Sequence, residues 1–190
     1  MALKCKLEKS ILKKDSCEYT LNSVKEVYLA SIDDVTKITR ETPSGMTGTT
    51  DCGVEVSEIT LGDGAKWAKI MPSTNSANFQ DNLMTIDAGG KYRHQILNFS
   101  INGAFDAQMQ CNLDNLSLGE YVAIVRLASG NYILLGDEAV GLTATACNNT
   151  GAGSATEFSG IQVTMEADVT VSAAPLSEKA ITALKQAIAE

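Results

Sequence analysis

The sequence predicts a mostly β fold: a β-sandwich or partly closed barrel with one flanking α-helix and a C-terminal helix. In residues 161–171 apolar and polar side chains alternate, which is the period of a strand with one buried and one solvated face. Residues 121–127 and 132–135 form a second clear pair, joined by a segment in which Gly130 and Asn131 tolerate the positive φ of a tight hairpin. Many strands with few helices favour a sandwich or barrel over a parallel α/β fold.

Five more segments are expected to be strands, because each is apolar and is bounded by Gly, Asp, Asn or Ser turn residues. In one of them, residues 54–61, the apolar side chains change from even to odd positions, so a straight strand would leave half of them in water. A bulge near Ser57 and Glu58 would bring them to one face. The expected strands are residues 24–32, 54–61, 83–87, 93–101 and 142–146.

Two segments have helical spacing instead. Residues 104–118 place apolar side chains four, four and three positions apart, and Gly119 then ends the helix. Residues 177–189 have similar spacing, and Ser177 is in position to cap the first turn. We also expect long loops at residues 40–53 and 148–160, which are rich in Gly, Ser and Thr; loops of this length usually have a function.

The 190 residues are expected to form a single domain: a basic N-terminal arm at 1–14, a β-sandwich body at 15–172 and the C-terminal helix. The net charge is −8, but the arm holds five lysines against one glutamate, so +4 in the arm leaves −12 elsewhere. An acidic body repels nucleic-acid phosphates and is compatible with a wall past which DNA slides; simple solubility is the alternative. The arm would dock on an acidic neighbour, or would be a solvated helix or frayed tail.

Catalytic and metal-binding patterns are not recognisable. His94 is the only histidine and lies in a predicted strand, so a triad or a multi-histidine site would depend on it alone. The five cysteines are scattered without a Cys-x-x-Cys motif, which favours free thiols in a reducing cytosol. We therefore expect no catalytic, cofactor-binding or metal-binding residues, and no membrane segment or secretory signal, because no apolar run approaches the length of about 20 residues that spans a bilayer.

Other polar and aromatic residues have structural interpretations. The carboxylate pairs Asp33-Asp34 and Asp137-Glu138 fall where solvated turns are expected. The aromatic residues are sparse and are better core candidates than a base-stacking platform, which would need exposed rings among basic residues. These core candidates are Trp67, Phe79, Tyr92 and Phe99.

Several features in order resemble the tail tube and related virion proteins of phages and prophages that infect Bacteroidetes. They are DSC at residues 15–17, VKEVYLA at 24–30, Asp34 followed by Val35, the hairpin at 121–136 and GLTAT at 141–145. The resemblance implies a β-sandwich subunit that closes into a ring, usually hexameric, and stacks into a hollow tube through which DNA passes without specific binding. It also implies other tail proteins as partners, a place in the virion, and assembly in the host cytoplasm.

The sequence therefore favours a structural protein that is not an enzyme. The C-terminal helix departs from the simplest tube subunit, so a terminator or neck protein stays open. A monomeric β-sandwich binding module for a carbohydrate or protein is the alternative from another class, and an enzyme without a known motif is a third. For a ring subunit, the arm and the first long loop would join neighbours; the assembly residues predicted there are Lys4, Lys6, Lys9, Arg40, Met46, Thr47 and Asp51.

Overall fold

The computed structural model describes residues 23–41, 54–87, 89–102, 107–151 and 159–188. Antiparallel strands dominate and two α-helices accompany them, which confirms the predicted fold class. The elements are β1 (Val24–Ser31), a 3-10 turn (Ile32–Asp34), β2 (Val35–Glu41), β3 (Glu55–Leu61), β4 (Ala68–Ile70), β5 (Asn78–Thr85), β6 (Lys91–Asn102), α1 (Ala107–Leu118), β7 (Glu120–Leu127), β8 (Tyr132–Leu135), β9 (Leu142–Thr150), β10 (Gly160–Val169), β11 (Ala174–Pro175) and α2 (Glu178–Gln186).

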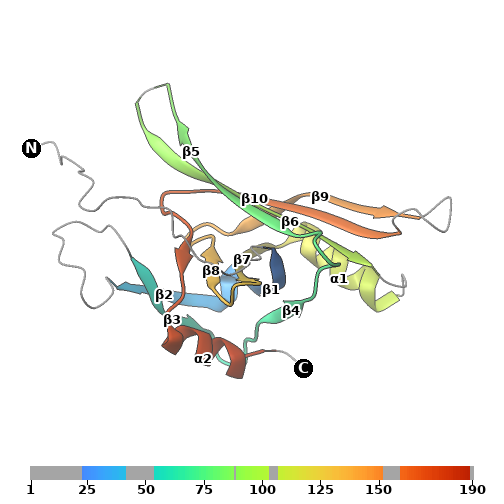
Figure 1. The fold of residues 1–190 in the computed structure, drawn as a ribbon, viewed down its shortest axis with the longest axis horizontal. Coiled ribbons are helices and arrows are strands. Elements are labelled where there is room, and N and C mark those ends of the chain that lie inside the picture. Colours follow the sequence, from blue (N-terminus) through green and yellow to red (C-terminus); the bar gives the residue numbers. More distant parts are fainter. Residues whose placement is uncertain (1–22, 42–53, 88, 103–106, 152–158, 189–190) are drawn as a thin grey trace, which may run out of the picture.

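Nine strands form one sheet that folds over itself at β7 (Figure 1). Strand β7 pairs with β1 over residues 121–127 and with β8 over residues 123–126, but only Glu120 and Tyr121 at its start pair with β9. Beyond that corner, β9, β10, β6 and β5 form an upper layer, and β4, β1, β7, β8 and β11 form a middle layer. Phe99 and Met165 of the upper layer share one buried cluster with Leu29 and Val125 of the middle layer, so the main core lies between the two layers.

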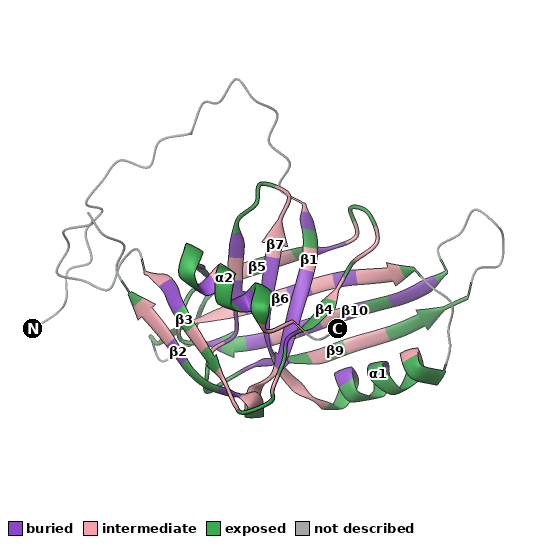
Figure 2. Cartoon of the chain, turned by 90° about the horizontal axis from the view of Figure 1, so that it is seen from below, coloured by how far each residue is buried: buried purple, intermediate pink, exposed green. Residues whose placement is uncertain are grey.

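A third layer covers the other face of the middle layer. Strands β2 and β3 form a separate two-stranded sheet, and α2 packs beside β3 (Figure 1). Their side chains, with Trp67, enclose a second core around Tyr28 and Ile124. In β7 successive side chains therefore enter different cores: Val122 and Ile124 face the third layer, whereas Ala123 and Val125 face the upper layer. This explains why the segment is apolar without alternation, and Figure 2 shows how deeply the neighbouring β1 is buried.

Several predicted local features are confirmed. Residues 161–169 alternate between buried and more exposed positions within β10, and the predicted hairpin joins β7 to β8 with Gly130 at φ 90°. The bulge is present: Thr39 pairs with Glu58 and Arg40 pairs with Val56, which leaves Ser57 as the extra residue. Of the predicted core aromatics, Trp67 and Phe99 are buried, and Phe79 and Tyr92 are partly buried.

Both predicted helices are present: α1 is helical over all the described residues of the predicted range, whereas α2 ends at Gln186, before the predicted residue 189, and Ile188 forms a bridge with Trp67 instead. In α1 the side chains of Leu113 and Leu116 are buried, and the Gly119 N–H donates to the Asn115 carbonyl at 2.9 Å where the helix ends. Residues 103–106 lie outside the described part of the chain. In α2 the Ser177 hydroxyl caps the first turn by accepting a hydrogen bond from the Ala180 N–H at 3.3 Å. Neither helix of the described ranges is long and apolar enough to cross a membrane.

Three expectations were wrong. Residues 40 and 41 belong to β2 rather than to a loop, and residues 148–150 and 160 belong to β9 and β10. Strand β5 starts at Asn78 instead of residue 83. These polar stretches have weak intrinsic strand preference, but each pairs with a neighbouring strand, and that tertiary pairing decides their conformation. The remaining parts of the two expected loops, residues 42–53 and 152–158, lie outside the described chain.

Candidate assembly surface

The outer face of the upper layer is not covered by another described element, since β2, β3 and α2 all lie on the opposite side of the molecule (Figure 1). The strand register sends alternate side chains of β5, β6, β10 and β9 to this face. Most of them are polar, and none of those described is lysine or arginine. The polar members include Asn78, Gln80, Asn82, His94, Asn98, Ser100, Asn102, Thr143, Thr145, Asn148, Thr150, Gln162, Thr164, Glu166 and Asp168.

Hydrogen bonds cross this face from strand to strand. The Asn98 side chain of β6 donates to Asn78 Oδ1 of β5 at 3.2 Å and accepts from the Thr164 hydroxyl of β10 at 2.8 Å. The Thr145 hydroxyl of β9 donates to the Thr164 carbonyl at 3.4 Å. These three bonds, each donated by a side chain, connect β5, β6, β10 and β9, so part of the face is a hydrogen-bonded polar surface.

The charged side chains of the face gather around His94. Its Nδ1 lies 2.7 Å from Asp168 Oδ1, and its Nε2 lies 3.9 Å from Glu166 Oε2. A shallow hollow beside them is lined also by Glu120 and by threonines of β9, and no serine or cysteine is among its described lining residues. Both ring nitrogens therefore face carboxylates rather than a serine or cysteine that the imidazole could activate. The described ranges also contain no group of three or more His, Cys, Asp or Glu side chains placed to hold a metal ion.

The hairpin of β5 and β6 projects beyond the rest of the sheet (Figure 1). The pairing of β10 with β6 ends at Arg93, so residues 83–87 and 89–92 form a two-stranded tip, with Leu83 at its base opposite Arg93. Three large apolar side chains of this tip are exposed: Leu83 at 55%, Met84 at 40% and Ile86 at 52%. Apolar side chains gathered at a projecting end are typical of a contact surface.

Strand β5 is also an open edge, because it pairs only with β6 in the described sheet. At the turn of the hairpin the Ile86 N–H donates to the Gly90 carbonyl at 2.8 Å. In an antiparallel hairpin the bonded positions recur every second residue, so Met84 and Asn82 are bonded to β6. The backbone groups of Leu83 between them point to the open edge, where another strand could pair with them.

The predicted assembly residues are placed only in part. Arg40 lies on β2, where its Nη1 is 2.8 Å from Asp137 Oδ1, and the Ile38 N–H donates to Glu138 Oε2 at 3.0 Å. The sequence had predicted that the acidic turn after β8 would only be solvated. In the structure this turn is bonded to β2. A role of Arg40 in assembly stays a prediction. The other predicted assembly residues lie outside the described ranges; they are Lys4, Lys6, Lys9, Met46, Thr47 and Asp51.

Sequence reasoning missed the outer face and the apolar tip. The polar members of β10 were visible as the solvated half of an alternating strand, but the matching positions of β5 were not, since residues 78–82 were not predicted as a strand. Comparisons with protein-family models, curated proteins and solved structures found no match for the chain. Function is accordingly inferred from the surfaces themselves.

Proposed function

We propose that the chain is a structural virion protein, a tail tube-like subunit that closes into rings and stacks into a tube for the passage of DNA. The observation that supports this function best is the outer face of the upper layer. It is an uncovered, largely polar face in which some side chains are hydrogen-bonded to one another and no described side chain is lysine or arginine, as the inner surface of a DNA conduit requires.

The electrostatic reason is the density of charge on DNA. A duplex carries one negative charge per approximately 1.7 Å of its axis, so lysine or arginine side chains on the wall would bind phosphates and hold the DNA in place. Uncharged amides and hydroxyls bind phosphates weakly, and the carboxylates of Glu166 and Asp168 repel them. DNA would pass such a wall without specific binding.

Ring closure would use the open edge of the upper layer. An exposed strand edge promotes aggregation in a monomer, but between copies of a ring subunit it becomes the joint. Strand β5 is the open edge of the upper layer and lies next to the face proposed as the inner wall. Hexameric rings are the expected form, other tail proteins are the expected partners, and assembly in the host cytoplasm would precede incorporation into the virion.

Cysteine labelling tests which face lines the tube. Gln162→Cys places a thiol on the outer face of the upper layer, and Gln186→Cys places a matched thiol at the end of α2 on the opposite side; both glutamines are exposed. We expect a maleimide carried on a large polyethylene glycol to label both thiols in dissociated subunits. In assembled particles it should label only Gln186→Cys, because the other thiol faces the lumen.

Labelling is read peptide by peptide with mass spectrometry, so the native cysteines can stay in place. Equal labelling of the two thiols in assembled particles would show that the polar face lies outside, and the conduit proposal would then fail. Protection of Gln186→Cys alone would reverse the orientation of the subunit and would contradict the proposal equally.

A further inference from the structure

We propose that β4 and the groove between β4 and α1 bind an extended segment of a partner protein. The segment adds to the open edge of β4 as a further strand and inserts apolar side chains, at alternate positions, into the groove. Strand β4 lies beside α1 at the edge of the middle layer and pairs with β1 alone among the described strands (Figure 1). This contact is separate from the ring closure proposed at β5.

One edge of β4 is available to another strand. Just before β4, the Trp67 N–H donates to the carbonyl of Ala187 in the segment after α2 at 2.8 Å, where the two segments form a parallel bridge. Backbone groups of successive strand residues point to alternate edges, so those of Ala68 and Ile70 point the other way, to β1. The N–H and C=O of Lys69 therefore point away from β1, along the edge at which the chain already pairs one short segment of its own.

The groove runs along this edge. Residues 68–71 all line it, although the side chains of successive strand residues point to opposite faces, so the groove follows the backbone of β4. The Lys69 side chain is directed to Glu26, whose Oε1 lies 2.7 Å from its Nζ. The buried side chains of Leu113 and Leu116 form the facing wall on α1. The groove has a volume of about 460 Å³, which is within the range of roughly 300–1,000 Å³ in which proteins enclose ligands.

The strand edge and the groove together specify the chemistry of the occupant. Backbone donors and acceptors at a strand edge pair with an extended polypeptide, and pockets beside the edge select its alternate side chains. The described residues that line the groove include no aspartate or glutamate, and the one lysine among them is paired with Glu26, so the inserted side chains should be apolar and uncharged. Met71 at the rim is 69% exposed and adds apolar area beside the open edge.

The open edge strand β5 of a second copy does not meet this requirement. One face of β5 carries Phe79 and Leu83 with Asp81 between them, and the other face carries asparagine and glutamine from residue 78 to residue 82. Either face would bring a charged or polar side chain into an apolar groove, which costs free energy when the group finds no partner there. Phe79 also packs against the main core of its own subunit. We therefore assign the segment to a partner protein.

A synthetic peptide tests the strand edge. The probe is a fluorescent peptide of alternating valine and threonine, flanked by lysines for solubility, and its anisotropy reports binding to dilute full-length protein. Lys69→Pro removes the N–H that points to the open edge and costs no bond to β1, whereas Lys69→Ala loses the same side chain and keeps the N–H. We expect Lys69→Pro to bind the peptide at least roughly tenfold more weakly than Lys69→Ala does. Circular dichroism verifies that both variants are folded.

The groove is tested separately with Met71→Asp and its control Leu118→Asp, which changes an apolar side chain that is 89% exposed at the end of α1 and does not line the groove. We expect Met71→Asp to weaken peptide binding and Leu118→Asp to leave it unchanged. A second peptide, with proline in place of its central threonine, should not bind the unmodified protein, because proline cannot complete the pairing with β4.

Three results would overturn the proposal: no binding of the first peptide to the unmodified protein, equal binding by Lys69→Pro and Lys69→Ala, or equal binding of the two peptides. If Lys69→Pro prevents ring formation and Lys69→Ala does not, a second copy occupies the edge and the assignment to a partner protein is wrong. An unmodified protein that never forms rings would refute the proposed function, but it would leave the peptide result standing.

Discussion

Leu83→Pro is expected to abolish assembly and to leave the subunit folded. The N–H of Leu83 points to the open edge of β5, because the hydrogen bond of Ile86 to Gly90 fixes which alternate residues are bonded to β6. Proline removes this N–H and costs no ladder bond within the subunit. A neighbouring strand that needs the donor can no longer pair there, so light scattering should report monomers at concentrations where the unmodified protein forms rings.

Two control variants separate the backbone effect from other effects. Leu83→Thr removes the same apolar side chain but keeps the N–H, so it should still assemble, at a higher concentration. Met84→Pro removes an N–H that is bonded within the hairpin and should destabilise the subunit itself. If rings of Leu83→Pro persist, or if Leu83→Thr and Leu83→Pro fail equally, the edge of β5 is not the joint.

Glu26→Gln is expected to lower the free energy of unfolding by about 1–2 kcal/mol at pH 7, less than the full pKa shift would give, because water screens the partly exposed side chains of Lys69 and Arg126. The Glu26 carboxylate joins three elements: Oε1 lies 2.7 Å from Lys69 Nζ of β4, and Oε2 accepts hydrogen bonds from the Tyr28 hydroxyl at 2.7 Å and from Arg126 Nη1 at 3.0 Å. Burial by itself would raise the pKa of Glu26, but these hydrogen bonds outweigh it and lower the pKa to about 2. The hydrogen bonds in the folded state therefore stabilise the ionised form of the Glu26 side chain.

The same shift predicts a pH dependence. Since the pKa of Glu26 is lower in the folded chain than its usual value of 4.5, its contribution is complete above pH 4.5 and is lost as the pH falls toward 2. Urea unfolding at a series of pH values should show that the difference between the unmodified protein and Glu26→Gln shrinks over this range. A difference that stays constant with pH would show that the Glu26 carboxylate is not held in its ionised form by these partners.

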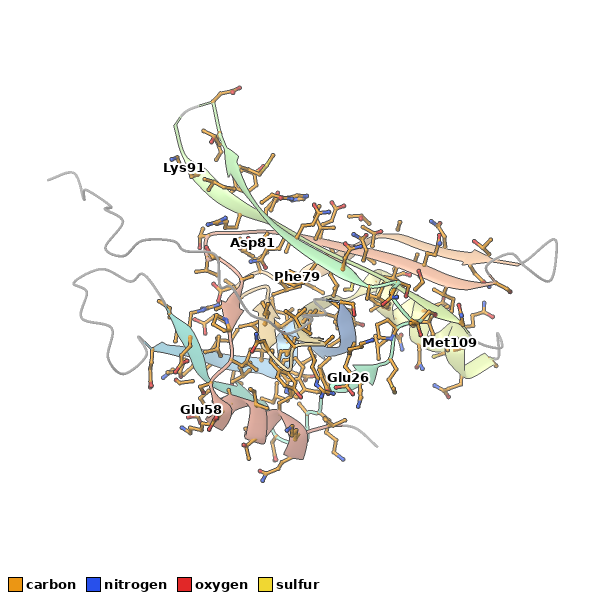
Figure 3. All side chains as sticks on the ribbon, viewed as in Figure 1. Glu26, Glu58, Phe79, Asp81, Lys91 and Met109 are labelled. Atoms are coloured by element: carbon orange, nitrogen blue, oxygen red, sulfur yellow. The ribbon has the colours of Figure 1, made fainter. Side chains whose placement is uncertain are left out.

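Glu58→Gln is the matched control for this prediction (Figure 3). Its carboxylate lies 2.7 Å from Lys179 Nζ, and the hydrogen bond with that side chain lowers the pKa of Glu58, but both groups stand in water. Exposed ion pairs contribute little to stability because water and salt screen them. We therefore expect a much smaller loss for Glu58→Gln than for Glu26→Gln.

The elements with strong local signals could be predicted from the sequence. The alternation in β10, the Gly130 turn, the bulge at Ser57 and the cap at Ser177 all depend on residues close together in the chain. By contrast, β2 and the first half of β5 are polar and become strands by pairing with β3 and β6. Local patterns do not contain that information.

The candidate assembly surface was less predictable for a related reason. Whether a strand is an edge, and whether a sheet face is covered, depends on the order of strands in the sheet and on the packing of distant elements. Met84 and Ile86 gave a sequence signal of an ordinary apolar strand, and only the projection of the hairpin beyond β10 leaves them exposed. The third layer could not be predicted for the same reason. The apolar run of β7 is compatible with a strand buried on one face and with a strand buried on both faces.

The solution mass of the purified protein over a concentration series tests the proposed function most directly. Light scattering after gel filtration gives the mass, and negative-stain images of the concentrated fraction give the shape. We expect masses of several subunits that increase with concentration, with rings or stacked tubes in the images; rings that never stack would favour a terminator or neck protein instead. A mass near 20.1 kDa at every concentration would contradict self-assembly and favour a monomeric binding module.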